Sequence, residues 1–166
     1  MTITSITDSV ERLDKGSSDG SYARGLHRPL IAGGTATILT QADSGALCLF
    51  DTAAGTLFTL PSTPVVGTYF DFGFTVKTTG EYKLVTGTVA SEFLLGFIVG
   101  GSTDVTEIDG FVGNGSSHVS VSMNGTTTGG DAGGNLRVTA ISATQWYISG
   151  NTYGGTATPA TPFDTT

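Results

Sequence analysis

The sequence predicts an all-β protein, an antiparallel β-sandwich or barrel of jelly-roll-like type with an extended N-terminal arm. Short runs of apolar and β-branched residues recur along most of the chain. Twenty-five glycines, with many Thr and Ser residues, separate these runs as turns. Good helix formers cluster in few places. The 166 residues correspond to one domain that is large enough to bury its own core.

Residues 1–28 form a compositional zone of their own. They carry four cations and four anions, so the net charge of −7 falls on the remaining residues. A flexible polar link, Gly16–Gly20, follows a segment with a helical apolar spacing. That spacing predicts a short amphipathic helix around Thr7–Lys15, with its apolar side formed by Ile3, Ile6, Val10 and Leu13. We expect an arm that is either a disordered tail or becomes ordered on a partner.

Residues 29–153 are expected to form the β-rich body. Alternation places Phe70, Phe72, Phe74 and Val76 on one face of a strand, and Val119, Val121 and Met123 on the inner face of another. About ten strands without a helical crossover fit an antiparallel sandwich or barrel. The predicted strands are Thr35–Thr40, Ala46–Phe50, Thr56–Leu60, Tyr69–Lys77, Glu81–Val85, Phe93–Val99, Val105–Asp109, His118–Met123, Asn135–Ile141 and Gln145–Ser149.

The second and third of these strands are predicted to form a hairpin. Their connection, Asp51–Gly55, has turn-forming residues at both ends, and Pro61 ends the second strand. Cys48 lies within the first strand and is the only cysteine, so the chain contains no intrachain disulfide. We expect Cys48 to be a structural thiol.

The remaining segments are predicted to be turns and extended chain. Asn114-Gly115 and Asn124-Gly125 match glycosylation sequons but are expected to be Asn-Gly turns. Gly125–Gly134 is too rich in glycine to pack a core, which predicts a mobile surface loop or a bulged connection. The tail, residues 154–166, is expected to be extended, with Phe163 docking it onto a neighbour.

Charge and hydropathy exclude several classes of partner. An acidic body with three cations cannot neutralise a row of phosphates, so nucleic-acid binding is not expected. The N-terminus lacks the pattern of a secretory signal. The longest apolar run, Phe93–Val99, is far shorter than a membrane span of ~20 residues. We therefore expect a soluble protein, made in the cytoplasm, without a membrane partner.

The motifs associated with catalysis or metal binding lie in contexts that favour structural roles. Gly16–Gly20 matches the G-x-S-x-G pattern around Ser18, but it lies in a polar linker and not between a strand and a helix. His118 begins a strand, where a surface role is commoner than catalysis. An acidic group at Asp104, Glu107 and Asp109 is interpreted as solvated edge charge, because its spacing matches no calcium loop. We expect no enzyme activity, cofactor or metal.

Five blocks of the sequence carry a resemblance to known proteins: Leu26–Ala32, Thr37–Pro61, Gly67–Phe72, His118–Gly130 and Ile141–Gly150. These blocks resemble capsid decoration (cement) proteins of tailed bacteriophages, of the marine and cyanophage type. They also resemble modules of head and tail fibres. The resemblance to decoration proteins covers residues 26–150 and implies a β-rich homotrimer on the outer capsid surface of the virion, bound to the major capsid protein, with no catalytic residues.

Two groups of site residues follow from this expectation. The arm would bind the capsid, with its cations pairing to acidic groups and its apolar side chains packing, through Tyr22, Arg24, Leu26, His27 and Arg28. The strand at Phe93–Val99 is apolar on both faces, which predicts that one face is buried between subunits. The predicted trimer interface consists of Phe93, Leu95, Phe97 and Val99.

The alternative is a receptor- or glycan-binding domain of a head or tail fibre. Trp146, Tyr147 and Tyr153 would then supply stacking surfaces for a ligand, although a Trp within a strand is more often part of the core. A depolymerase or esterase ranks behind both, because the sequence contains no evident pair of catalytic acids and no Ser/His/Asp arrangement.

Overall fold

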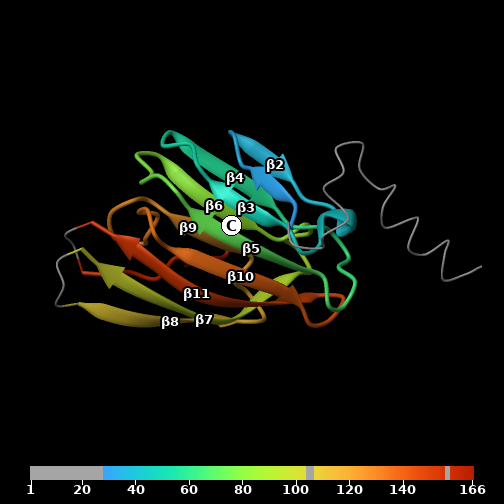
Figure 1. Ribbon diagram of the computed structural model, residues 1–166. Helices are drawn as coiled ribbons and strands as arrows, with labels where there is room; N and C mark the ends of the chain where they lie inside the picture. Colours follow the sequence, from blue (N-terminus) through green and yellow to red (C-terminus); the bar gives the residue numbers. More distant parts are fainter. Residues whose placement is uncertain (1–27, 104–106, 156–157) are drawn as a thin grey trace, which may run out of the picture.

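The computed structural model describes residues 28–103, 107–155 and 158–166 (Figure 1). Two mixed β-sheets pack face to face, which confirms the predicted all-β sandwich. One 3-10 turn, η2 (Gln41–Asp43), lies between the second and third strands. The strands are β1 (Leu30–Ala32), β2 (Ala36–Ile38), β3 (Leu47–Phe50), β4 (Gly55–Thr59), β5 (Tyr69–Phe74), β6 (Glu81–Val85), β7 (Phe93–Ser102), β8 (Ile108–Asn114), β9 (Ser120–Met123), β10 (Asn135–Ala140), β11 (Gln145–Gly154) and β12 (Phe163–Asp164).

The first six strands alternate between the two sheets. The seven-stranded sheet has the order β1-β3-β5-β10-β11-β7-β8, and the five-stranded sheet has the order β12-β9-β6-β4-β2. Each connection crosses to the opposite sheet. After two such crossings the chain is back in the first sheet and runs in its original direction. The pairs β1–β3, β3–β5, β2–β4 and β4–β6 are therefore parallel. The expected antiparallel, jelly-roll-like pairing is wrong for this half of the chain.

The predicted hairpin at residues 46–60 is wrong for the same reason. β3 and β4 belong to different sheets, and residues 51–54 form an arch between them. Pairing across the arch is replaced by packing: the rings of Phe50 and Phe58 meet edge to face, with centroids 5.1 Å apart. Turn-forming residues at both ends of a short connection are compatible with a hairpin or an arch, and only the tertiary partners decide between them.

The second half of the chain contains the antiparallel pairs. β10 lies between β5 and β11, and β8 pairs with β7, all antiparallel. β11 and β7 form a parallel pair ten residues long. Both strands continue beyond the predicted ends into Gly-rich sequence, because their neighbours supply backbone partners. The strand predicted at Val105–Asp109 is displaced to Ile108–Asn114, and residues 104–106 lie outside the described residues.

The core lies between the sheets and is rich in aromatic side chains. Phe70, Phe72 and Phe74 are all buried, as the alternation predicted, and so are Val119, Val121 and Met123. Val76, predicted on the same face as the phenylalanines, lies beyond the end of β5 and is exposed, so this part of the prediction is wrong. Phe50 contacts several other rings, and its ring stacks on that of Phe74 with centroids 4.9 Å apart. Cys48 is also completely buried, and burial raises the pKa of its thiol to about 12. Cys48 is thus a core side chain, as expected.

Both Asn-Gly turns are confirmed and have the same geometry. In each turn the glycine has a positive φ, +71° at Gly115 and +74° at Gly125. The side-chain oxygen of Asn114 accepts the N–H groups of residues 116–118, and that of Asn124 accepts those of residues 126–128. The following glycine-rich segment packs against β11, because the N–H of Gly130 donates to the hydroxyl of Thr152. That segment is therefore an ordered connection with buried glycines.

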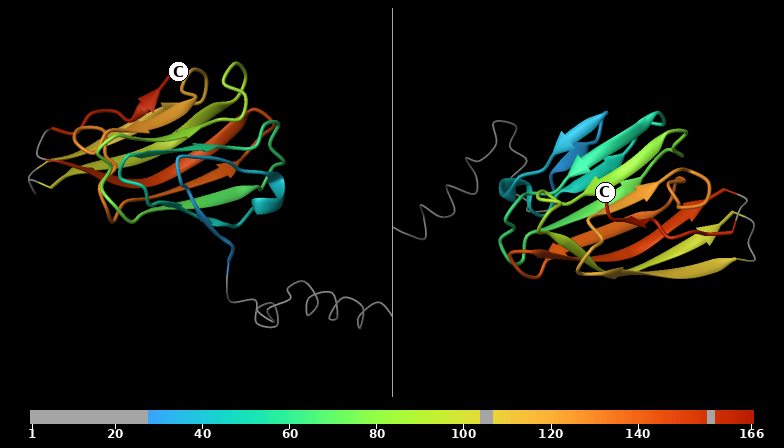
Figure 2. Two further views of the ribbon diagram at one scale, coloured as in Figure 1. Left: turned by 90° about the horizontal axis from the view of Figure 1, so that it is seen from above. Right: turned by 180° about the vertical axis from the view of Figure 1, so that it is seen from behind.

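The C-terminal segment is part of the sandwich. β12 pairs with β9, and Figure 2 shows the C-terminus beside the five-stranded sheet. Phe163 is buried in the core of its own chain, and its ring stacks on His118 at 5.3 Å. The prediction that Phe163 docks onto a neighbour is therefore corrected. Intrachain burial is favoured because the short β12 brings the ring over the gap beside Gly113.

Candidate functional site

The outer face of the seven-stranded sheet carries apolar side chains at one end. The parallel and antiparallel registers align the outward residues of β11, β7 and β8 in rows, such as Ser149–Phe97–Val112. The alternate residues, including Leu94, Ile98 and Trp146, point into the core. We define the apolar patch as the outward side chains Leu95, Phe97, Val99, Ile108, Val112, Tyr147 and Tyr153.

Two glycines allow aromatic rings to lie flat on this face. A side chain at Gly110 would collide with the ring of Phe97, 2.4 Å from a Cβ placed there. The ring of Tyr153 lies over Gly101 in the same way, at 3.1 Å. Phe97 remains 46% exposed and Val112 64% exposed despite this packing. The rings therefore form a low apolar surface that is open to solvent.

The same region carries no charge on its outer side. Within the described part of β11, β7 and β8, none of the outward positions is Asp, Glu, Lys or Arg. The next strands, β10 and β5, contribute Arg137 and Asp71 to the same face. The chain as a whole has a net charge of −7, whereas the outward side chains of these three strands are uncharged.

The charged side chains beside the patch form a compact cluster. Arg137 binds the carboxylate of Asp71 in a bidentate manner, with its Nη2 2.7 Å from Oδ2, and lies over the ring of Tyr69. Arg28 binds the same carboxylate and also donates to the carbonyls of Gly45 and Ala46. These hydrogen bonds, that of Arg137 foremost, hold the pKa of Asp71 below its usual range.

The predicted site residues fall into two groups. Phe93, Leu95, Phe97 and Val99 all lie on the outward side of β7, and the last three belong to the apolar patch. Arg28 is the one described member of the predicted capsid-binding arm, and its acidic partner in the structure is Asp71 of the same chain. Tyr22, Arg24, Leu26 and His27 lie outside the described residues, as does the helix predicted around Thr7–Lys15.

The three aromatic residues of the alternative interpretation do not share one surface. Trp146 is completely buried and contacts Phe70, with ring centroids 6.2 Å apart. Tyr147 and Tyr153 point outward from β11, on the same side as Phe97. Only the two tyrosines can therefore contact a ligand on the outer face.

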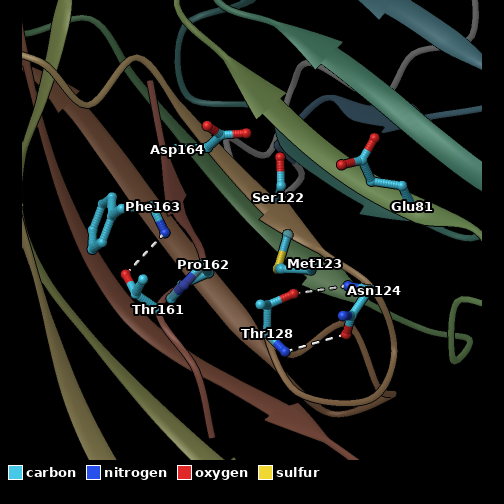
Figure 3. Close-up of a pocket in the computed structure, with 9 residues that line it drawn as sticks. All are labelled: Glu81, Ser122, Met123, Asn124, Thr128, Thr161, Pro162, Phe163 and Asp164. Carbon is cyan, nitrogen blue, oxygen red and sulfur yellow. Dashed lines mark hydrogen bonds between the residues drawn. The ribbon is translucent and has the colours of Figure 1, made fainter. Parts of the chain in front are cut away.

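A groove on the other side of the sandwich lies between the C-terminal segment and the start of β6. Its carboxylates, Glu81 and Asp164, flank the hydroxyl of Ser122 (Figure 3). The nine residues that line the groove include neither histidine nor cysteine. Serine therefore has no imidazole base beside it, and the lining does not make a nucleophile–base pair.

Other polar groups have structural contacts. Glu92 is buried, and its Oε1 accepts the N–H of Thr63, whose φ is +52°. Glu107 and Asp109 are exposed, and Asp104 lies outside the described residues. In the described ranges, no three His, Cys, Asp or Glu side chains come together as metal ligands. Within those ranges there is also no helix with the length and apolarity of a membrane span.

Sequence reasoning missed two of the seven side chains of the apolar patch, Ile108 and Val112. They belong to β8, whose predicted position was too early in the chain. Ile108, Gly110, Val112 and Asn114 share one face at a spacing of two residues, but three glycines within and beside this strand obscured the pattern. Asn135 and Asn151 also reach the outer face, and isolated asparagines gave no pattern that distinguishes a site from a turn.

Comparisons of the chain with protein-family models, with curated proteins and with solved structures found no match in any of the three.

Proposed function

We propose that the chain is a non-enzymatic structural protein of a virion, which binds the outer capsid surface as a homotrimer and stabilises contacts between major capsid proteins. The observation that carries the self-association is the uncharged apolar patch on the outer face of β11, β7 and β8. The sequence blocks that resemble capsid decoration proteins supply the capsid as the second partner.

The charge distribution favours a second copy of this chain on the patch. Each copy carries a net charge of −7, so identical chains repel one another unless their contact avoids the acidic groups. The cores of interfaces between identical subunits are depleted in charge and enriched in aromatic residues. The patch meets both conditions, and we assign the contact to its part around Leu95, Phe97, Val112 and Tyr147.

The capsid contact is assigned to the arm. Residues 1–28 carry equal numbers of positive and negative charges. Three such arms on one trimer bind the same particle together, and this multivalency raises the affinity of the trimer for the capsid. Arg28 connects this arm to the patch-bearing sheet, since it is hydrogen-bonded to the loop before β3 and to Asp71. A rigid sandwich then carries the arm at a fixed point of its surface.

The substitution Phe97→Glu tests the trimer. The intact chain is expected to have three times its 16.9 kDa mass in size-exclusion chromatography with light scattering. Phe97→Glu places a charge in the centre of the patch and is expected to yield a monomer with an unchanged circular dichroism spectrum. Ile38→Glu is the matched control, because Ile38 is an equally apolar and more exposed residue of the other sheet. A monomeric wild-type chain, or an unaffected Phe97→Glu trimer, would contradict the proposed interface.

A further inference from the structure

The outer face contains a hollow at one end of the apolar patch. It measures about 350 Å³ and is lined by Val99, Gly101, Ile108, Asn135, Gly150, Asn151 and Tyr153. This volume lies within the range of about 300–1,000 Å³ that is typical of small-molecule sites. The lining residues lie at the ends of β7 and β11 and at the starts of β8 and β10. None of these residues is charged.

Two glycines shape the floor of the hollow. Gly101 leaves room for the ring of Tyr153. Gly150 has a φ of +144°, and a Cβ there would lie 2.2 Å from the carbonyl oxygen of Asn135. β11 and β10 therefore approach each other more closely than strands with side chains at this position could. The floor is backbone, and Val99, Ile108 and Tyr153 are its apolar boundaries.

The polar groups of the hollow are fixed by one another. The side-chain oxygen of Asn151 accepts the N–H of Asn135 at 3.1 Å. The amide nitrogen of Asn151 donates to the hydroxyl oxygen of Tyr153 at 3.3 Å. In this arrangement the Tyr153 hydroxyl acts as an acceptor, so its own proton can be donated to a ligand, and the amide of Asn151 is held in one orientation. The exposed side chain of Asn135 adds a second amide at the rim.

We propose that this hollow binds a neutral sugar ring, in addition to the structural role of the protein. A pyranose has an apolar C–H face and a rim of hydroxyl groups. Its C–H face matches the ring of Tyr153 and the side chains of Val99 and Ile108, as apolar faces stack on aromatic rings. Its hydroxyls match the amides of Asn135 and Asn151, which both donate and accept hydrogen bonds. Because no cation lines the hollow, a sialic acid or a phosphate would lack a partner.

The hollow takes Val99, Ile108 and Tyr153 from the apolar patch, and the trimer contact is assigned to its remaining side chains. Leu95 and Phe97 pair across with Tyr147 and Ser149, whereas the hollow involves the rows of Asn151 and Tyr153. Val99 forms the boundary between them. The sugar proposal therefore does not depend on the trimer, and the two fail in different measurements.

The test is saturation-transfer difference NMR on the intact chain, with glucose, galactose, mannose, rhamnose and N-acetylglucosamine as separate probes. A single ring is expected to bind with a dissociation constant of about 1–10 mM. Tyr153→Ala is expected to weaken the binding of the sugar that binds best at least tenfold. Tyr69→Ala is the control, since Tyr69 is an exposed tyrosine on the same face of the same sheet that belongs neither to the hollow nor to the patch, and this variant should bind as the wild type does.

A second variant keeps the proposal testable if Tyr153→Ala does not fold. Asn135→Ala removes only an exposed amide and is expected to weaken binding about fivefold, with an unchanged thermal midpoint. Light scattering on each variant shows whether a loss of sugar binding is accompanied by a loss of the trimer. The proposal is overturned if none of the five sugars binds, if the folded Tyr153→Ala or Asn135→Ala variant binds like the wild type, or if Tyr69→Ala weakens binding equally.

Discussion

At the scale of single residues, Asp71 joins Arg28, the first described residue, to β5 and β10. It lies on β5, the third strand of the seven-stranded sheet, and its side chain is only 16% exposed between two arginines. Arg28 and Arg137 come from positions far apart in the sequence, so their convergence on one carboxylate fixes the first described residue against β5. Charge-assisted and bidentate hydrogen bonds of this kind are stronger than neutral ones.

Asp71→Asn is expected to destabilise the fold by about 1 kcal/mol at pH 7, because both arginines are more than a third exposed and solvent screens the pairs. The folded-state pKa of Asp71 is lowered, so its contribution is complete above the unfolded-state pKa of about 3.9. The contribution is lost as the pH falls through the folded-state value. Urea unfolding, followed by the fluorescence of the buried Trp146, measures both effects.

The control for Asp71→Asn is Asp131→Asn, which removes one partly exposed ion pair, that with Lys77. We expect the control to change the free energy of unfolding by less than about 0.5 kcal/mol. If the difference between wild type and Asp71→Asn were the same at pH 7 and at pH 3, the assignment of the stabilisation to the ionised carboxylate would be wrong.

At the scale of elements, β12 shows how a short strand can close a sandwich. It has two residues and pairs with β9, yet Phe163 adds a buried ring to the core. His118 forms one side of its pocket, and its Nδ1 accepts the N–H of Asn114 at 3.2 Å. The Asn-Gly turn after β8 and the C-terminal strand are therefore coupled through one imidazole ring.

Phe163→Ala is expected to lower the free energy of unfolding by about 3 kcal/mol or more, since it removes a buried aromatic side chain and leaves a cavity. Thr165→Ala, an exposed substitution two residues further on, should leave stability within about 0.5 kcal/mol of the wild type. Chemical unfolding of the three proteins provides the comparison. A wild-type stability for Phe163→Ala would show that the C-terminal segment does not contribute to the core in solution.

At the scale of the whole molecule, the two faces of the sandwich differ in what they offer a partner. The outer face of the seven-stranded sheet combines a neutral apolar end with a charged centre at Asp71 and Arg137. The five-stranded sheet presents Glu81, Lys83 and Asp164 beside small hydroxyl side chains. Self-association is therefore expected on the first face, and the root of the arm lies at the same sheet through Arg28.

Removal of residues 1–27 tests the role of the arm in the proposed function. Arg28 is retained because its contacts with Gly45, Ala46 and Asp71 belong to the folded body. We expect the shortened chain to keep the thermal midpoint and the number of subunits of the full chain but to lose cosedimentation with purified capsids that lack the protein. Equal cosedimentation of both chains would show that the body, and not the arm, makes the capsid contact.

The sequence alone determined the class of the fold and most of the core. Alternating phenylalanines around Phe72 and alternating valines around Val121 identified inward faces, because a strand repeats every two residues regardless of its partners. The same periodicity placed Phe93, Leu95, Phe97 and Val99 on one side of β7. Asn-Gly dipeptides identified both turns, since glycine tolerates the positive φ that they need.

Only the tertiary structure decided which strands pair and in which direction. Residues 51–54 are equally suitable for a hairpin and for an arch, and the choice depends on whether β3 finds its partners in β1 and β5. The same holds for the functional surface. Val99, Asn135 and Tyr153 are far apart in sequence and meet only because β7, β11 and β10 lie side by side. Strand order depends on interactions summed over the whole core, which no local pattern of residues encodes.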